Sequence, residues 1–192
     1  MDLARRLGLH YMTDIANLET ILKHGILSRT TVLERGVQFS DISDGEVQIR
    51  REQTEPIFGR RIHDYVPLYL NPRNAMLYKR KELQDRIAIL RIDPDAVLSH
   101  ATLYTDGNAA ASSTEFSLDP DIMLGSLQAL EAEFWTNVPD GRRRRMAEVL
   151  IHESVPPDAI ERVACNNHQL AHHIREEHGL YAAVEAEKFF RI

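Results

Sequence analysis

The residue of this sequence best placed to do chemistry is Glu148. It stands between Ala147 and the apolar residues 149–151, in a stretch typical of a buried strand. Carboxylates are seldom placed among apolar neighbours unless they are paired or used, because burying a lone charge is costly. A half-buried carboxylate can orient hydroxyl groups or stabilise a positive charge that develops during a reaction. The pattern is equally compatible with a Glu148 that strand alternation turns toward solvent.

Arginines form a second group of candidate functional residues. A guanidinium group binds phosphate oxygens in a bidentate fork, so clustered arginines can form an anion site. The alternative is an ordinary solvated surface, which the sequence alone favours for the run before the Glu148 strand. The clusters are Arg50-Arg51, Arg60-Arg61 and the run Arg142, Arg143, Arg144, Arg145.

Two further groups suggest other chemistry. Tyr65 and Tyr69 fall on one face of an expected strand and could stack on a flat ring, although core packing is the default interpretation. Near the C-terminus, His168 and His172 would share one helix face beside Cys165. The sequence contains no HExxH motif and no second cysteine, so we expect surface histidines and no metal. P-loop, GxGxxG and GxSxG motifs are also absent.

Length and composition bound the possible functions. The 192 residues, of which 43% are hydrophobic and 27% charged, suit one soluble domain over 1–192. No run approaches the ~18 apolar residues of a membrane helix, and no secretory signal begins the chain, so no membrane contact is expected. The single cysteine excludes an internal disulfide and fits a reducing, cytoplasmic setting.

Charge is distributed unevenly along the chain. The net charge of −6 argues against a protein that coats nucleic acid by charge alone. Residues 47–91 carry 10 bases and 5 acids, whereas residues 92–141 carry 9 acids and no base. A basic block in an acidic protein suggests a local anion site, with two differently charged solvated faces as the alternative.

The elements that must position these residues indicate an α+β fold, in which short strands mix with segregated helices. A helix over 13–25 should be capped by Thr13 or Asp14 and end at Gly25 in the left-handed conformation. Pro67 marks an edge or irregular position in its strand. Asn71 or Asn74 should cap the next helix. Strands are expected at 9–12, 65–70, 86–92, 100–104, 147–151, 162–165 and 184–190, and helices at 13–25, 31–35, 75–80, 122–135 and 169–177.

Four segments together resemble the DarT family, the toxin half of DarTG toxin–antitoxin systems. They are YMTDIANLETILKHGILS at 11–28, HDYVPLYLNPRNAMLY at 63–78, TDGNAAAS at 105–112 and RRMAEVLIHESVPPDAI at 144–160. They occur in the family's order and span most of the chain. The resemblance implies an ADP-ribosyltransferase fold, a split β core with flanking helices whose cleft holds NAD+. It also implies transfer of ADP-ribose from NAD+ to a base of single-stranded DNA.

The resemblance assigns catalytic roles to two residues. Glu148 resembles the catalytic glutamate, which holds a hydroxyl of the nicotinamide ribose. Loss of neutral nicotinamide leaves positive charge on that ribose, which a fixed carboxylate stabilises. Arg51 resembles the arginine that acts on the acceptor base.

Binding roles also follow from the resemblance. Tyr11, Thr13 and Asn17 match the family's first NAD+-binding motif, although many members have a histidine where Tyr11 stands. Tyr65 and Tyr69 match the lining of the nicotinamide pocket, and Arg73 matches an arginine near the NAD+ phosphates. The DNA-facing residues would be Arg50, Asn108, Arg142, Arg143, Arg144 and Arg145.

The resemblance leaves several questions open. The acceptor is thymidine in one branch of the family and guanosine in another, and single-stranded DNA suits either because a paired base is a poor nucleophile. A toxin of this kind implies a cognate antitoxin, DarG-like, that silences it. The alternatives are the same fold acting on RNA or protein, a non-catalytic nucleic-acid-binding module, and, least favoured, a metal-dependent hydrolase.

Overall fold

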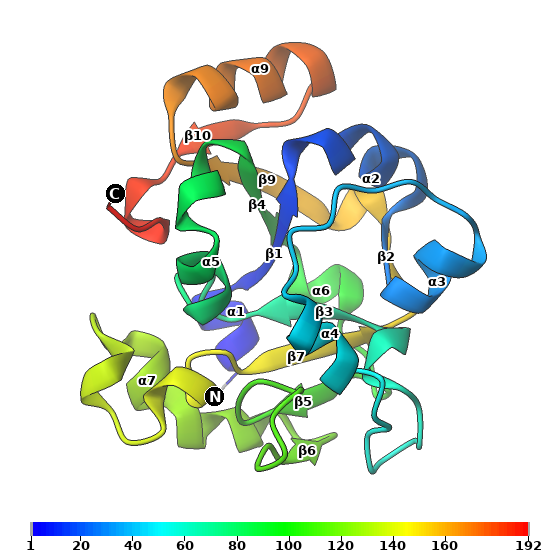
Figure 1. Ribbon diagram of the computed structural model, residues 1–192, viewed down its shortest axis with the longest axis vertical. Coiled ribbons are helices and arrows are strands. Elements are labelled where there is room, and N and C mark those ends of the chain that lie inside the picture. Colours follow the sequence, from blue (N-terminus) through cyan, green and yellow to red (C-terminus); the bar gives the residue numbers. More distant parts are fainter. Residues whose placement is uncertain (1, 192) are drawn as a thin grey trace.

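The computed structural model describes residues 2–191 and is built around one mixed β-sheet (Figure 1). Its strand order is β10-β9-β4-β1-β3-β7-β5-β6, and a separate pair joins β2 to β8. The strands are β1 Leu9–Asp14, β2 Ile26–Leu27, β3 Tyr65–Tyr69, β4 Ile87–Ile92, β5 Leu103–Thr105, β6 Phe116–Ser117, β7 Glu148–His152, β8 Ser154–Val155, β9 Ile160–Cys165 and β10 Ala182–Val184.

Short helices surround this sheet. The α-helices are α1 Leu3–Leu7, α2 Leu18–His24, α3 Arg29–Glu34, α4 Gly45–Arg50, α5 Ala75–Lys79, α6 Pro94–Val97, α7 Leu127–Glu131, α8 Gly141–Arg144 and α9 His168–His178. The 3₁₀ turns are η1 Ile15–Asn17, η2 Ile62–Asp64, η3 Lys81–Arg86, η4 Pro120–Ser126, η5 Trp135–Asn137, η6 Pro157–Ala159 and η7 Ala186–Lys188. This arrangement confirms the α+β prediction.

The sheet is split between β1 and β3. β1 pairs with β4 over six residue pairs, and β3 pairs with β7 over five. Between β1 and β3, however, only His10 and Tyr69 are paired. Pro67 lies in the part of β3 that is not paired with β1. The N–H that proline lacks is therefore not needed for hydrogen bonds between those two strands. The prediction of an irregular position is confirmed, whereas the edge position is wrong because β3 is internal.

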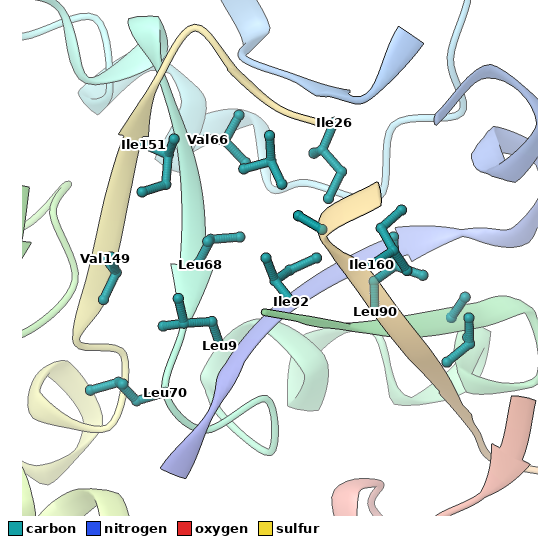
Figure 2. Packing of buried hydrophobic residues seen from close by; sticks show 14 of the residues in the cluster. Leu9, Ile26, Val66, Leu68, Leu70, Leu90, Ile92, Val149, Ile151 and Ile160 are labelled. Carbon is teal, nitrogen blue, oxygen red and sulfur yellow. The ribbon is translucent and has the colours of Figure 1, made fainter. Parts of the chain in front are cut away.

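The largest core cluster holds the two halves of the sheet together. In Figure 2, apolar side chains of β7, β3, β1, β4 and β9 converge on one interior. Ile26 of β2 completes the packing there. The fully buried members each remove a large apolar surface from water, at about 25 cal/mol per Å². The labelled residues are Leu9, Ile26, Val66, Leu68, Leu70, Leu90, Ile92, Val149, Ile151 and Ile160.

The predicted helix over 13–25 is confirmed with a different start. Asp14 caps η1 by accepting from the Ala16 amide, and α2 continues to His24. Gly25 has a φ of +80° but a ψ of 177°, so it has a positive φ without being left-handed helical. A Cβ at this position would lie 2.4 Å from the Val155 carbonyl oxygen, so glycine is required for space as well as for conformation.

Most other predicted elements are present, including the Asn74 cap of α5. Three are wrong in part. The helix over 122–135 is α-helical only in α7, because its first part is the 3₁₀ turn η4 and Arg145 takes up the carbonyls of Ala129, Leu130 and Ala132 where α7 ends. The strand predicted over 184–190 is wrong beyond Val184, since β10 spans 182–184, its parallel partner β9 ends at Cys165 and residues 186–188 form the 3₁₀ turn η7. The strand over 100–104 begins instead at Leu103.

Candidate active site

A cavity of about 550 Å³ opens where the sheet splits. This is within the usual size range of pockets that hold small molecules and cofactors. Its walls come from β1, the segment between β2 and α4, β3, α5 and α8. In Figure 1, α4 lies over β3 and β7, and the residue that follows it, Arg51, reaches down to the β7 strand.

Glu148 begins β7 and is completely buried. The Ala109 amide donates to Oε1 at 3.1 Å. The Glu148 backbone is fixed as well, because its amide donates to Thr105 Oγ1 at 2.9 Å and its carbonyl accepts from the same hydroxyl. The carboxylate is therefore held rigidly just behind the part of the cavity wall that Arg51 forms, as preorganised charge stabilisation requires.

Arg51 covers this carboxylate. Its Nη1 lies 3.0 Å from Oε2 and 3.2 Å from Oε1, and its Nη2 lies 3.0 Å from Oε2. Only 5% of Arg51 is exposed. Burial lowers the pKa of Arg51, but the Glu148 carboxylate together with Tyr69 and Tyr11 raises it by more, so the guanidinium stays charged. The two residues predicted to be catalytic thus form one buried ion pair, although they are 97 positions apart in the sequence.

Two tyrosines lie next to this pair. Tyr69 is the cross-strand partner of Glu148, and burial together with that carboxylate raises the pKa of its phenol. Burial likewise raises the pKa of Tyr11 to about 12. Both phenols are therefore neutral near pH 7 and can donate or accept hydrogen bonds. Tyr11 lines the cavity, so a hydroxyl stands in the position where many family members have a histidine.

Thr13 and Asn17 shape the neighbouring wall. The Asn17 amide nitrogen donates to Thr13 Oγ1 and to the Ser40 carbonyl, both at 2.9 Å, and Asn17 Oδ1 accepts from the Ser40 amide at 2.7 Å. Asn17 therefore joins β1 to the segment that covers the cavity. Tyr65 also lines the cavity. Its hydroxyl donates to buried Glu55 at 2.9 Å, which leaves the ring as the part that can contact a ligand.

The arginines predicted to face DNA have different surroundings. Arg50 and Arg142 line the cavity and are exposed, and their guanidinium groups make no ion pair or hydrogen bond within residues 2–191. Arg143 also lines it, but a bidentate pair with Asp106, at 2.7 and 2.9 Å, occupies its guanidinium. Asn108 lies on the rim, where its Oδ1 accepts from the Ala110 amide.

Besides Glu148, which lies behind Arg51, three predicted site residues lie outside this cavity. Arg144 donates to the Gly125 carbonyl. Arg145 is 3% exposed and donates to four backbone carbonyls, so its guanidinium is occupied within the fold and does not face a DNA strand. Arg73 lies over the Phe190 ring and donates to the Phe189 carbonyl, apart from the residues that would hold NAD+.

Several cavity residues were not found from the sequence. Met76, Lys79 and Arg80 come from α5 and its end, and others come from the segment 27–51, which shows no periodicity. One feature of the sequence points to these residues, because a long aperiodic stretch within a compact domain is usually functional. The residues of that segment include Arg29, Val32, Val37, Phe39 and Asp41.

The C-terminal histidines lie on or next to α9, away from the cavity. Among residues 2–191, no three histidine, cysteine or acidic side chains lie close enough together to hold a metal ion. None of the helices in this range has both the length and the apolar character needed to span a membrane.

Comparison with known proteins identifies the fold and its relatives. A family model described as single-stranded DNA thymidine ADP-ribosyltransferase, DarT, matches residues 10–188. A transferase–glycohydrolase fusion protein of Thermosipho africanus is 27% identical over 173 residues, and the match covers 88% of this chain and 45% of that protein. A DNA ADP-ribosyl transferase of Thermus sp. strain 2.9 is 27% identical, with 81% of this chain and 79% of the relative covered.

Solved structures show the same fold. Thermosipho africanus DarTG with ADP-ribose superposes with a TM-score of 0.86 at 24% identity, over 95% of this chain and 51% of that one. Thermus sp. 2.9 DarT with ADP-ribosylated single-stranded DNA gives 0.85 at 20% identity, over 97% of both chains. The split-sheet ADP-ribosyltransferase fold is therefore confirmed. The chain spans about half the length of the Thermosipho relative.

Proposed function

Because this chain belongs to the DarT family, we propose that it transfers ADP-ribose from NAD+ to a base of single-stranded DNA and releases nicotinamide. The observation that carries the proposal is the rigid Glu148–Arg51 pair, in which Arg51 lines a cavity that opens where the sheet splits and Glu148 lies directly behind it. Relatives have been solved with NAD+ and with ADP-ribosylated single-stranded DNA, which supports both substrates. The family description favours thymine as the acceptor.

The reaction exchanges one glycosidic bond for another. The bond between the ribose and nicotinamide breaks, and nicotinamide leaves as a neutral group with the bonding electron pair. A nitrogen of the base supplies the pair for the new bond, and its proton passes to solvent. Positive charge develops on the ribose in between, and the fixed Glu148 carboxylate stabilises it more than it stabilises the ground state.

Arg51 has two roles in this proposal. It covers Glu148, so a ribose hydroxyl reaches the carboxylate only when the guanidinium shifts. Once it has shifted, its charge lies where the acceptor base enters. A cation there stabilises the negative charge that forms on a base nitrogen as its proton leaves. Since Arg51 stays protonated, it acts as an electrostatic group and not as a base.

The remaining cavity residues bind the two substrates. We assign Tyr11, Thr13, Asn17, Tyr65 and Tyr69 to the NAD+ side, where aromatic rings and hydroxyl groups suit a nicotinamide ribose. The exposed arginines Arg50 and Arg142, together with Asn108 and Arg143, suit the acceptor strand. Both groups line the same cavity, which agrees with a reaction that brings two substrates together.

The proposal extends to regulation and location. One relative is named as a fusion of a DNA ADP-ribosyl transferase with a DNA ADP-ribosyl glycohydrolase. That pairing supports a toxin role for this chain and a separate DarG-like antitoxin that removes the modification. The single buried cysteine agrees with a cytoplasmic protein. The family match over 10–188 and the continuous sheet support one domain over 1–192.

The test uses the full chain, NAD+ and four short single-stranded oligonucleotides, each with one type of base as the candidate acceptor. Intact-mass spectrometry should show one added ADP-ribose on the thymine strand and none in the Glu148→Ala variant. Addition to the guanine strand alone would place the chain with the guanosine branch. Addition only to RNA or to lysate proteins, or salt-dependent DNA binding with no product, would contradict the proposal.

A further inference from the structure

Three aromatic side chains meet on the surface beside α5, although they come from distant parts of the sequence. The centroid of the Tyr78 ring lies 5.2 Å from that of Phe190 and 6.4 Å from that of Trp135. The Trp135 and Phe190 centroids are 5.7 Å apart, and all three pairs pack edge to face. Tyr78 is 51% exposed. Figure 1 shows the C-terminal segment, which carries Phe190, next to α5. Tyr78, Trp135 and Phe190 are called the aromatic platform below.

A cation lies over each ring of the platform. The Arg73 guanidinium is 4.9 Å from the Phe190 centroid, Arg145 is 5.7 Å from that of Trp135, and Lys81 Nζ is 5.4 Å from that of Tyr78. None of these three cations forms an ion pair with a carboxylate of residues 2–191. Arg145 is buried and donates to four backbone carbonyls, so the charges that can meet an anionic partner here are those of Arg73 and Lys81.

Two of these cations also line a second cavity, of about 240 Å³. Arg73, Arg145 and Lys188 face it, and Glu187 is the one carboxylate among its described lining residues. Lys188 donates to Nε2 of buried His10 at 3.1 Å, and burial lowers the pKa of His10 to about 3, so this histidine adds no charge. Lys188 is paired with Glu185 at 3.6 Å, so Arg73 supplies the unpaired positive charge of this cavity, which is small enough to suit one phosphate group.

The platform lies close to the proposed active site. Met76 and Lys79 of α5 line the large cavity, while Tyr78 of the same helix joins the platform. A helix with its side chains is about 10–12 Å across, so a short strand of DNA would span the two sites.

We propose that the aromatic platform and the adjoining basic cavity bind the part of the DNA strand that flanks the modified base. A base stacks on Tyr78 and its neighbours, and a backbone phosphate contacts Arg73. Exposed aromatic rings interleaved with cations are the usual construction of a single-strand site, since every base has a stacking face. This inference rests on the proposed function, because it names a further contact for the same substrate.

The test compares Tyr78→Ala with Tyr181→Ala. The control removes another exposed tyrosine, 65% exposed, that packs against no other aromatic ring of the described residues. Fluorescence anisotropy without NAD+ measures binding of a strand of about 12 nucleotides, within the usual site sizes. Tyr78→Ala should weaken binding at least about 5-fold, and Tyr181→Ala should not change it. Arg73→Gln should lower the slope of log affinity against log salt by about 0.7.

Equal affinities in the two tyrosine variants would overturn the inference, as would an unaltered chain that binds the long strand no better than a trinucleotide. Lys81→Gln provides a second variant and should also weaken binding of the long strand. Tyr78→Ala protein that keeps its DNA affinity but no longer binds a DarG-like protein would assign the platform to a protein partner instead. Failure of the proposed function would give a different result: the unaltered chain would bind the strand normally but would not modify it.

Discussion

Replacing Glu148 by glutamine tests the proposed site most directly, because it removes one charge and nearly preserves shape. The variant leaves the Arg51 guanidinium buried without its carboxylate. Removing one partner of a buried ion pair costs about 3–5 kcal/mol. For a chain of this size each kcal/mol lowers Tm by about 2–4 °C, so we expect a loss of about 6–20 °C.

The effect on transfer should exceed the effect on stability. A preorganised group that stabilises transition-state charge contributes about 2.7–4 kcal/mol, so transfer should slow by about 100-fold or more. Single-turnover transfer to the oligonucleotide, followed by intact mass well below the Tm of the variant, measures this rate on folded protein. Ile174→Ala is the matched control, since it deletes a fully buried side chain on α9 and costs about 2–5 kcal/mol without touching the cavity.

Three outcomes would refute this reasoning. Transfer within a few-fold of the unaltered rate would remove Glu148 from the mechanism, and an equal loss of transfer in Ile174→Ala would make the effect one of stability. A double-mutant cycle with Arg51→Gln should give a coupling of about 1–3 kcal/mol, as for residues in one buried network. A coupling near zero would show that the pair does not form in solution.

The other predictions concern stability. Arg145→Gln should lower the free energy of unfolding by about 2–4 kcal/mol in urea titrations because it frees four carbonyls, whereas Arg142→Gln should change it by less than about 0.5 kcal/mol and weaken only DNA binding. Asn74→Ala should cost about 1 kcal/mol by the same assay, since its side chain caps α5; no loss would show that water replaces the cap. His10 has its pKa lowered from 6.5 to about 3 by burial, so unfolded chains take up its proton first and stability should fall by about 1.4 kcal/mol per pH unit below about pH 6.5. Urea titrations of His10→Asn should show a slope shallower by that amount, and an unchanged slope would mean that His10 is not buried in solution.

Local pattern predicted the strands and helices that form from neighbouring residues. The apolar run at β4 and the capped stretch around α2 are examples, since each carries its period and its boundary residue within one segment. The stretch 122–135 also has a helical stripe, but its outcome depends on Arg145, which lies outside it. Long-range contacts of this kind leave no trace in a local pattern.

The run of arginines shows the same limit for the site. Consecutive residues of a helix point about 100° apart, because one turn takes 3.6 residues. Arg142 therefore faces the cavity, Arg143 turns to Asp106, and Arg145 turns into the fold. The sequence showed that the run could meet phosphate but not which member would, because α8 and its packing assign the directions. The Glu148–Arg51 pair was identified through family resemblance and not through any pattern that links the two positions.

The distribution of ion pairs shows how a chain with a net charge of −6 is suited to the two anionic substrates proposed for it. Around the cavity, Asp41 pairs with Arg29, Asp44 with Lys79, and Asp140 with Arg143. The acids of the lining are thus each matched by a cation. The guanidinium groups of Arg50 and Arg142 remain exposed there without a carboxylate. Coulomb attraction falls off within about 10 Å at moderate salt, so these few cations set the local potential while the distant acids contribute little.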